Sequence, residues 1–417
     1  MPFGECTWRN LTEAEAEAEA ETETEAETET EAEAETETEA ETMGERRRST
    51  PQGCWWSLAA QESGHHYRAM TSDTLAAAIS QFGDPRGYLA VASIGLPPRT
   101  ATEALTADLA AWSAAQRDPM GYDPVIERTR AHYSRLVGVP TTRIAAGSQT
   151  SVLTSVVAAA VPEGGEVLVA DGDFSSIVFP FLQRRGIRVR SVPLTALAES
   201  IAEDTWLVVF SLIQSATGVL AEVDAIREAS ARTGTLTFCD VTQAAGVHRV
   251  DAALFDVTVC HSYKWLCAPR GVAFMTLGER IDPLLTPIQA GWYAGDDVWQ
   301  SVYGPSMHLA LDARRFDVSP AWQAWIGAEQ SIGLFADLDI DEVWAHGAGL
   351  GDELCDALGT PQQHQAIVTW PDVSGHDLAS LIGSGIRVSG RAGRLRASFH
   401  LWNDATDVAA VVQALRP

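Results

Sequence analysis

The stretch TFCDVTQAAGVHRVDAALFDVTVCHSYKWLCAPRGVAFMT, at residues 237–276, decides the fold of this chain. Its first apolar run closes on Asp240 and predicts a strand, VTQAAGV predicts the start of a short helix, and DVTVCH predicts a second strand. Lys264 follows that second strand in a turn, and a third apolar run comes after it. The acid and the lysine can therefore meet at one edge of a parallel sheet.

A lysine and a carboxylate placed in this way are the pair that pyridoxal 5'-phosphate (PLP) needs. The lysine amine forms a Schiff base with the aldehyde of the cofactor. The carboxylate keeps the pyridine nitrogen protonated, so that the ring can accept electrons from a carbanion. We therefore predict that Lys264 and Asp240 are catalytic residues of a PLP enzyme.

The rest of the chain predicts an α/β fold of PLP fold-type I. Apolar runs of strand length recur between helix-length stretches, at residues 166–171, 187–193, 205–212, 235–240, 256–261 and 271–277. Their apolarity is continuous, which predicts a mostly parallel central sheet with helices on both faces. A long helix at about 323–338 is followed by shorter elements. We predict an N-terminal segment and large domain at 70–320, and a smaller α+β domain at 321–417.

Residues 1–69 differ in composition from the rest. Fifteen glutamates alternate with alanine and threonine at residues 13–41, and such a row of like charges repels itself. We expect a disordered, low-complexity extension at 1–69. Met70, where sequence of ordinary globular character begins, is the alternative start of translation.

The charge of the chain excludes some classes of partner. The net charge is −27, of which residues 1–50 contribute −13. The remaining −14 makes nucleic acid and anionic membrane poor partners. The chain has no apolar run of about eighteen residues and an acidic N-terminus, so we expect a cytoplasmic protein. The six cysteines form no CxxC pair, which fits a reducing compartment, and we predict no metal site.

Further residues fit a cofactor that carries a phosphate. Ser148 and Gln149 stand at the start of an apolar helix, where free N–H groups and the helix dipole favour an anion, although a simple helix cap is the alternative. Phe174 follows a strand and could stack on a planar ring or belong to the core. His261 and Tyr263 flank the lysine turn and could donate to the phosphate or be structural.

Gln243, three residues after Asp240, could reach the phenolic oxygen of the cofactor, or it could be an amide on a helix surface. Each of these residues has an ordinary structural explanation when it is considered alone. A single PLP site explains all of them together.

The motifs FCDVTQAAGV, CHSYKWLCAPRG, AAGSQTS and the terminal RLRASFH carry a family resemblance. From about Tyr88 to Pro417 the chain resembles the class V aminotransferase family of fold-type I PLP enzymes, which contains cysteine desulfurases and kynureninases. The resemblance implies that Lys264 is the Schiff-base lysine, that Asp240 is the partner of the pyridine nitrogen, and that Phe174 stacks on the ring. It also implies a phosphate pocket made by Ser148, Gln149, His261 and Tyr263.

Arg396 in RLRASFH matches the arginine with which this family clamps the substrate carboxylate, a bidentate task that suits guanidinium. The alternative is an ordinary surface arginine. The preceding segment, at 385–399, contains no cysteine, so persulfide transfer lacks its nucleophile.

Other motifs resemble particular branches of this family. Tyr263 directly before the lysine, and GWYAGDD at 291–297, resemble kynureninases, but Cys267 replaces their asparagine. YKWLCAPRG, AGWYAGDDVW and DARRFDVSPAW together are most similar to the actinobacterial branch that includes the hercynylcysteine sulfoxide lyase of ergothioneine biosynthesis.

The resemblance thus implies a homodimeric PLP-dependent lyase that cleaves the Cβ–S bond of a small cysteine-derived amino acid. A kynureninase-like hydrolase and a class V aminotransferase are the alternatives within this cofactor class. The non-catalytic alternative is a regulator that keeps the fold. A scaffold needs no lysine–acid pair, so the presence of Lys264, Asp240 and Arg396 together argues against it.

Overall fold

The computed structural model of this chain describes residues 72–391 and 393–416. The extension expected at 1–69, and the alternative start at Met70, lie outside the described residues.

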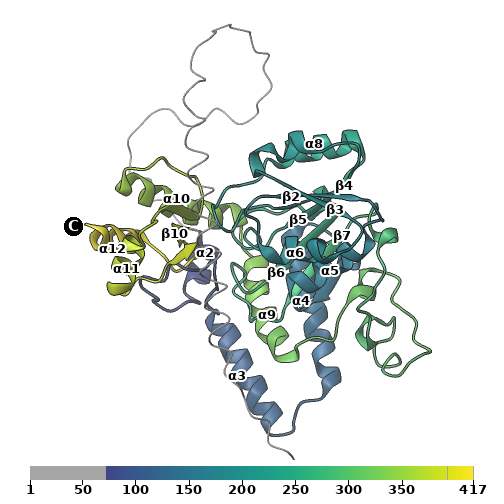
Figure 1. The fold of residues 1–417 in the computed structure, drawn as a ribbon. Coiled ribbons are helices and arrows are strands. Elements are labelled where there is room, and N and C mark those ends of the chain that lie inside the picture. The colour runs from purple at the N-terminus through teal and green to yellow at the C-terminus, as the bar shows by residue number, and fades with distance from the viewer. Residues whose placement is uncertain (1–71, 392, 417) are drawn as a thin grey trace, which may run out of the picture. The chain divides into compact units, whose positions relative to one another are not determined.

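A seven-stranded sheet forms the centre of the fold, in the order β1-β7-β6-β5-β4-β2-β3 (Figure 1). The pairs β3–β2, β2–β4, β4–β5 and β5–β6 are parallel, whereas β7 runs antiparallel to both of its neighbours. The mostly parallel sheet predicted from the sequence is confirmed. Its strands are β1 (Ile144–Gly147), β2 (Glu166–Ala170), β3 (Arg188–Val192), β4 (Thr205–Ser211), β5 (Leu236–Asp240), β6 (Val257–His261) and β7 (Ala273–Leu277).

Helices cover both faces of this sheet, which explains the continuous apolar runs. Alternate residues of one strand enter different cores: Val208 and Phe210 of β4 belong to one hydrophobic cluster, and Leu207 and Val209 belong to the other. The helices of this part are α3 (Arg99–Ser113), α4 (Asp123–Val137), α5 (Thr150–Ala160), α6 (Ser175–Gln183), α7 (Leu197–Ser200), α8 (Val223–Thr233) and α9 (Trp322–Ala336).

The C-terminal part is α+β. The strands β8 (Ile367–Pro371), β10 (Arg394–Ser398) and β9 (Ser389–Arg391) form an antiparallel sheet in that order. Leu354, Val368 and Phe399 share a separate core here. The helices of this part are α10 (Ile340–Leu358), α11 (His376–Gly383) and α12 (Ala405–Leu415) (Figure 1).

The beginning of the described chain returns to this small sheet. After α2 (Asp73–Ile79), Tyr88 pairs with Arg387 and Ala90 pairs with Ser398. The helix α9 matches the long helix predicted at 323–338, and it packs against α3 and α4. The domain boundary between residues 320 and 321 stays a prediction.

One local prediction from the sequence is wrong. VTQAAGV, at residues 241–247, forms a series of tight turns rather than the start of a helix. Gly246 has a φ of +95°, and a Cβ at this position would lie 3.0 Å from the carbonyl oxygen of Trp265. The segment is therefore packed against the lysine turn, and a regular helix would not allow this contact.

Among the residues that the structure describes, no helix is long and apolar enough to span a bilayer.

Candidate active site

A cavity of about 130 Å³ lies at the carboxyl ends of β5 and β6. Parallel neighbouring strands bring their carboxyl ends to the same edge of a sheet, which is where ligands bind in open α/β folds. The cavity joins six residues predicted from the sequence. Its lining consists of Gln149, Thr150, Ser151, Phe174, Ser176, Asp240, Thr242, His261, Tyr263, Lys264 and Arg270.

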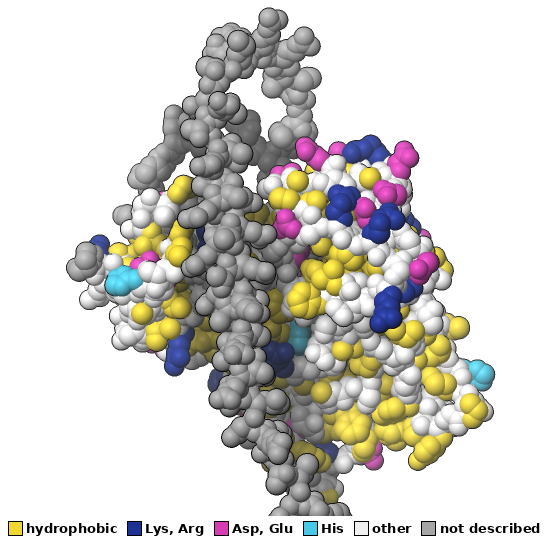
Figure 2. Space-filling model, in the orientation of Figure 1, with side chains coloured by type: hydrophobic (Ala, Val, Ile, Leu, Met, Phe, Trp, Pro, Cys, Tyr) yellow, Lys and Arg dark blue, Asp and Glu magenta, His cyan; other side chains and the backbone are white. Residues whose placement is uncertain are grey.

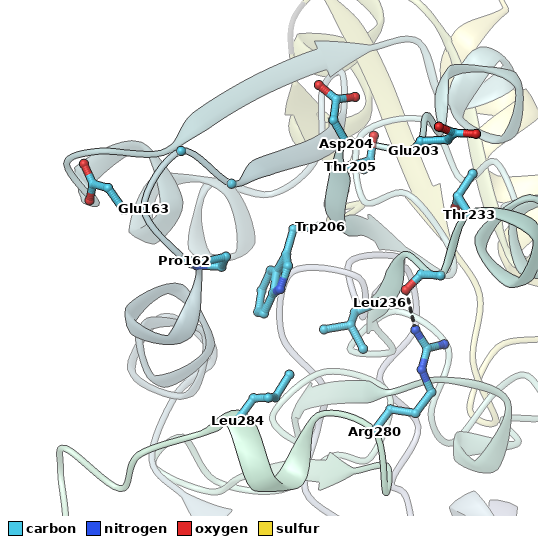
Figure 3. Close-up of a pocket in the computed structure, with 13 residues that line it drawn as sticks. Pro162, Glu163, Glu203, Asp204, Thr205, Trp206, Thr233, Leu236, Arg280 and Leu284 are labelled. Carbon is cyan, nitrogen blue, oxygen red and sulfur yellow. Dashed lines mark hydrogen bonds between the residues drawn. The ribbon is translucent and has the colours of Figure 1, made fainter.

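A larger cavity, of about 590 Å³, lies at the opposite edge of the sheet, near the starts of β2, β4 and β5. Figure 3 shows Trp206 and Leu236 within it, and Arg280, which donates a hydrogen bond to the carbonyl oxygen of Gly234 at 2.7 Å. None of the site residues predicted from the sequence lines this larger cavity. We therefore take the smaller cavity as the candidate active site.

Lys264 lies in the turn after β6, and its side chain is largely buried. Its Nζ is 5.2 Å from the centroid of the Phe174 ring and 5.9 Å from that of Tyr263. The turn is held by backbone hydrogen bonds from Cys267 to the carbonyl of Lys264 and from Gly95 to the carbonyl of Tyr263. The backbone that carries the lysine therefore has a defined position beside the cavity.

Gly95 is required by this turn. A Cβ on Gly95 would lie 2.0 Å from the carbonyl oxygen of Lys264, so no other residue fits without a shift of the backbone. Sequence reasoning missed this glycine, because it lies far from the lysine in the chain and carries no local signal.

Asp240 ends β5 inside the cavity. Its Oδ1 accepts a hydrogen bond from the backbone N–H of Thr242 at 2.8 Å. Burial raises the pKa of the Asp240 carboxyl, and the hydrogen bonds from Thr242 and the charge of Lys264 offset that rise only in part. A buried carboxylate of this kind gains from a cationic N–H partner, such as a protonated ring nitrogen.

Phe174 is the residue before α6, and 45% of its surface is exposed. Its ring lines the cavity next to Lys264 and offers a face on which a planar aromatic ring can lie. This position fits the stacking residue predicted from the sequence.

The start of α5 and His261 form the polar end of the cavity. Gln149 precedes α5 without a side-chain cap, and the first N–H groups of a helix have no partner within the helix. Ser148 lies next to Gln149 but not in the cavity lining. The buried Nε2 of His261 has no hydrogen-bond partner among the described residues. Burial, followed by the charges of Arg270 and Lys264, lowers the pKa of His261 to about 4, so the imidazole is neutral at pH 7.

Arg270 adds a positive charge that sequence reasoning missed. Its guanidinium carbon lies 4.5 Å from the centroid of the Tyr263 ring. Burial raises the pKa of Tyr263, and the charges of Arg270 and Arg396 oppose that rise. The sequence offered one clue to this residue, because Arg270 lies in APRG directly after the lysine turn. A guanidinium there suits an anion at this end of the cavity.

Gln243 and Arg396 lie outside the cavity lining. Gln243 is buried, and its amide bonds to protein groups. Arg396 is only 2% exposed, which excludes the alternative of an ordinary surface arginine. Its guanidinium donates to the hydroxyls of Ser93, Ser215 and Ser389.

These residues fit PLP. The amine of Lys264, the buried carboxylate of Asp240 and the ring of Phe174 line one cavity. The buried Nε2 of His261 has no hydrogen-bond partner among the described residues. The helix start with His261 and Arg270 could hold a phosphate, Phe174 could cover the ring, and Asp240 could meet its nitrogen.

Residues 122–411 match the family model described as aminotransferase class-V. The chain belongs to this family. It is 26% identical to an isopenicillin N epimerase of Amycolatopsis lactamdurans, over 40% of this chain and 48% of the epimerase. It is 27% identical to a kynureninase of Deinococcus radiodurans, over 51% of this chain and 54% of the kynureninase. The chain thus spans about half the length of these curated relatives.

Solved structures share the fold. A mutant of C-DES with glycine covalently linked to its PLP cofactor has a TM-score of 0.72 and 18% identity, over 79% of this chain and 95% of that chain. The cysteine desulfurase CsdA of Escherichia coli has a TM-score of 0.71 and 20% identity, over 82% and 97%. These similarities confirm the PLP fold-type I architecture predicted from the sequence.

Proposed function

We propose that this chain is a PLP-dependent carbon–sulfur β-lyase that acts on a cysteine-derived amino acid, with hercynylcysteine sulfoxide as the substrate. The observation that carries the proposal is a cavity that joins Lys264 and Asp240 without a thiol in its lining. The family includes PLP enzymes that cleave the Cβ–S bond and enzymes that pass sulfur to a cysteine. The cavity lining supplies the lysine and the acid for cleavage, and it contains no thiol that could accept sulfur.

The cysteines support this choice. Cys239, Cys260, Cys267 and Cys355 are free thiols, and all four are buried. Burial raises the pKa values of the first three thiols, so they are not nucleophilic thiolates. Persulfide transfer therefore has no suitable group among the described residues. Free thiols also fit the cytoplasmic location that we propose.

The cofactor is pyridoxal 5'-phosphate, which the C-DES structure carries and the cavity residues fit. When it is bound, it supplies an electron sink for the carbanion at Cα. In this proposal the Lys264 amine takes the Cα proton and Asp240 keeps the proton on the ring nitrogen. Arg396 holds the α-carboxylate of the substrate.

The elimination breaks the Cβ–S bond, and the electron pair leaves with sulfur. Addition of water then yields pyruvate and ammonia from the amino-acid part. A sulfoxide leaves as a sulfenate, which is a weaker base than a thiolate. Cysteine sulfoxides should therefore react faster than the corresponding thioethers.

We also propose a homodimer. Large apolar side chains are exposed on this chain, among them Leu311 at 99%, Tyr303 at 87% and Trp112 at 59%. Figure 2 shows apolar side chains gathered in patches on one face of the molecule. Exposed patches of this kind mark interaction surfaces. Sedimentation of the purified protein would test the dimer.

The reaction is tested by incubation of the purified protein with hercynylcysteine sulfoxide, while pyruvate is measured with lactate dehydrogenase. Pyruvate should appear in step with the loss of substrate and without a keto acid. If kynurenine gives anthranilate while sulfoxides are inert, the hydrolase is correct instead. If product forms only when a keto acid is present, the protein is an aminotransferase. A protein that stays colourless after addition of PLP would favour the non-catalytic regulator.

A further inference from the structure

A chain of hydrogen bonds connects the lysine turn to Arg396. The indole N–H of Trp265, the residue after Lys264, donates to Oε1 of Gln243 at 2.7 Å. Nε2 of Gln243 donates to the hydroxyl of Ser215 at 2.8 Å. The same hydroxyl accepts a hydrogen bond from Nη1 of Arg396 at 2.9 Å. Two segments that are 131 residues apart in the chain are thus joined through one glutamine and one serine.

The orientation of the Gln243 amide follows from its partners. An indole N–H can only donate, so the amide oxygen must face Trp265. Both hydrogens of Nε2 are then used, one on Ser215 and one on the carbonyl oxygen of Ala92 at 3.0 Å. Gln243 cannot donate to the phenolic oxygen of the cofactor without losing one of these bonds. Its position supports a structural link more than a cofactor contact.

Ser215 holds the guanidinium of Arg396 in two ways. Its hydroxyl oxygen accepts from Gln243 and from Arg396, and its carbonyl oxygen accepts from Nη1 of Arg396 as well. The remaining nitrogens of Arg396 donate to Ser93 at 2.8 Å and to Ser389 at 3.1 Å. A planar guanidinium with partners on three sides has little freedom to rotate.

Trp265 is also held at its backbone. Its carbonyl oxygen accepts a hydrogen bond from Nε2 of His400 at 2.9 Å. A carbonyl only accepts, so this nitrogen of His400 carries the proton. His400 follows Arg396 by four residues, and the Trp265 side chain is 1% exposed. Trp265 is therefore fixed at both ends, which makes it a rigid support for Gln243.

We propose that Trp265, Gln243 and Ser215 are positioning residues that orient Arg396 relative to Lys264 and so set the affinity for the substrate α-carboxylate. This inference rests on the proposed role of Arg396 as the carboxylate clamp. Loss of the link loosens the guanidinium but removes neither its charge nor an atom that lines the cavity. The affinity for a carboxylate should fall, whereas the affinity for PLP and the rate of the bound substrate should not.

The test compares Trp265→Phe with Trp325→Phe in the holoenzyme. Both tryptophans are 1% exposed, but the indole N–H of Trp325 has no hydrogen-bond partner among the described residues, so Trp325→Phe is a matched control. Calorimetry measures the Kd of 3-(methylthio)propanoate, a carboxylate without an amine. Kinetics with S-methyl-L-cysteine sulfoxide give KM and kcat, and titration of the apoenzyme gives the Kd of PLP.

We expect Trp265→Phe to raise the carboxylate Kd and KM by about threefold to tenfold, the effect of one lost hydrogen bond, with kcat and the Kd of PLP close to wild type. Ser215→Ala should act in the same direction, and Trp325→Phe should change none of these values. Melting temperatures show whether each variant is folded. If Trp265→Phe does not fold, the comparison of Ser215→Ala with wild type tests the proposal.

Two results would overturn the inference. One is an unchanged carboxylate Kd in both Trp265→Phe and Ser215→Ala. The other is a change in the Kd of PLP as large as the change in the carboxylate Kd, which would assign Gln243 to the cofactor. Binding of 3-(methylthio)propanoate needs no turnover. If the enzyme forms no pyruvate but Trp265→Phe weakens this binding, the positioning role of Trp265 is supported and the proposed lyase function is wrong. If Arg396→Ala leaves the binding unchanged, the clamp itself fails, and the inference falls with it.

Discussion

His400 should make the folded protein sensitive to mild acid. The side chain is buried between aromatic rings, stacked on Phe335 with ring centroids 5.3 Å apart, and its Nδ1 has no hydrogen-bond partner among the described residues. Burial lowers the pKa of His400 from 6.5 to about 3. Protonation would place a charge and an unpaired N–H in an apolar site, so the folded state keeps the ring neutral.

The lowered pKa of His400 sets both the direction and the size of its effect on the free energy of unfolding. The pKa of His400 is lower in the folded state, so its contribution to stability is complete above the unfolded pKa of 6.5 and is lost as the pH falls toward 3. Between pH 7 and pH 5 the unfolded histidine takes up about 0.7 of a proton, whereas the folded one takes up almost none. This difference costs about 2 kcal/mol of the free energy of unfolding.

The variant His400→Gln isolates the contribution of this histidine to the pH dependence of stability. Glutamine can keep a donor toward the carbonyl of Trp265, but it does not titrate. Urea unfolding at pH 7 and pH 5 gives the free energy of unfolding of each protein at each pH. The wild type should lose about 2 kcal/mol more than His400→Gln over this range. The exposed His376→Gln, as control, should behave like the wild type. An equal loss in wild type and His400→Gln would refute the reasoning.

Three further outcomes are expected. Borohydride treatment of the yellow holoenzyme should fix the cofactor on the peptide that contains Lys264, and Lys264→Ala should abolish turnover; a label on another lysine would contradict the site. Asp240→Ala should reduce kcat strongly with a small change in melting temperature, because the ring nitrogen loses its proton, and a pyruvate assay with a melting curve checks both. Arg130→Met should destabilise the fold by about 3–5 kcal/mol, since it leaves Asp317 buried without the guanidinium that lies 2.6 Å away, and urea unfolding measures this loss.

The sequence predicted most of the central sheet and the centre of the site. Each of the predicted runs between residues 166 and 277 is a strand of the structure. Five of the six are buried along nearly their whole length, which favours apolar residues at most positions. The exception is β3, an edge strand that carries Arg188 and Arg190 and is only partly buried. The presence of Lys264 and Asp240 in the lining of one cavity was predictable from the order of the strands. Neighbouring parallel strands end at one edge, so residues just after them meet without further information.

The helix expected at 241–247 shows where such reasoning stops. Its pattern is helical, but the close approach of Gly246 to Trp265 and a positive φ override the local preference. Gly95 was missed for the same kind of reason, since its contact with the carbonyl of Lys264 joins distant parts of the chain.

The sequence by itself determined the strands, the lysine–acid pair and the choice of cofactor, because these depend on periodicity and on short distances along the chain. Only the tertiary structure decided how Arg396 is held. Its partners Ser93, Ser215 and Ser389 come from three separate segments, and a serine carries no pattern that marks it as the partner of a particular arginine. The commitment of Gln243 to Trp265 and Ser215 was hidden for the same reason: a hydrogen bond depends on atoms within about 3 Å, and the packing of the whole fold sets those distances.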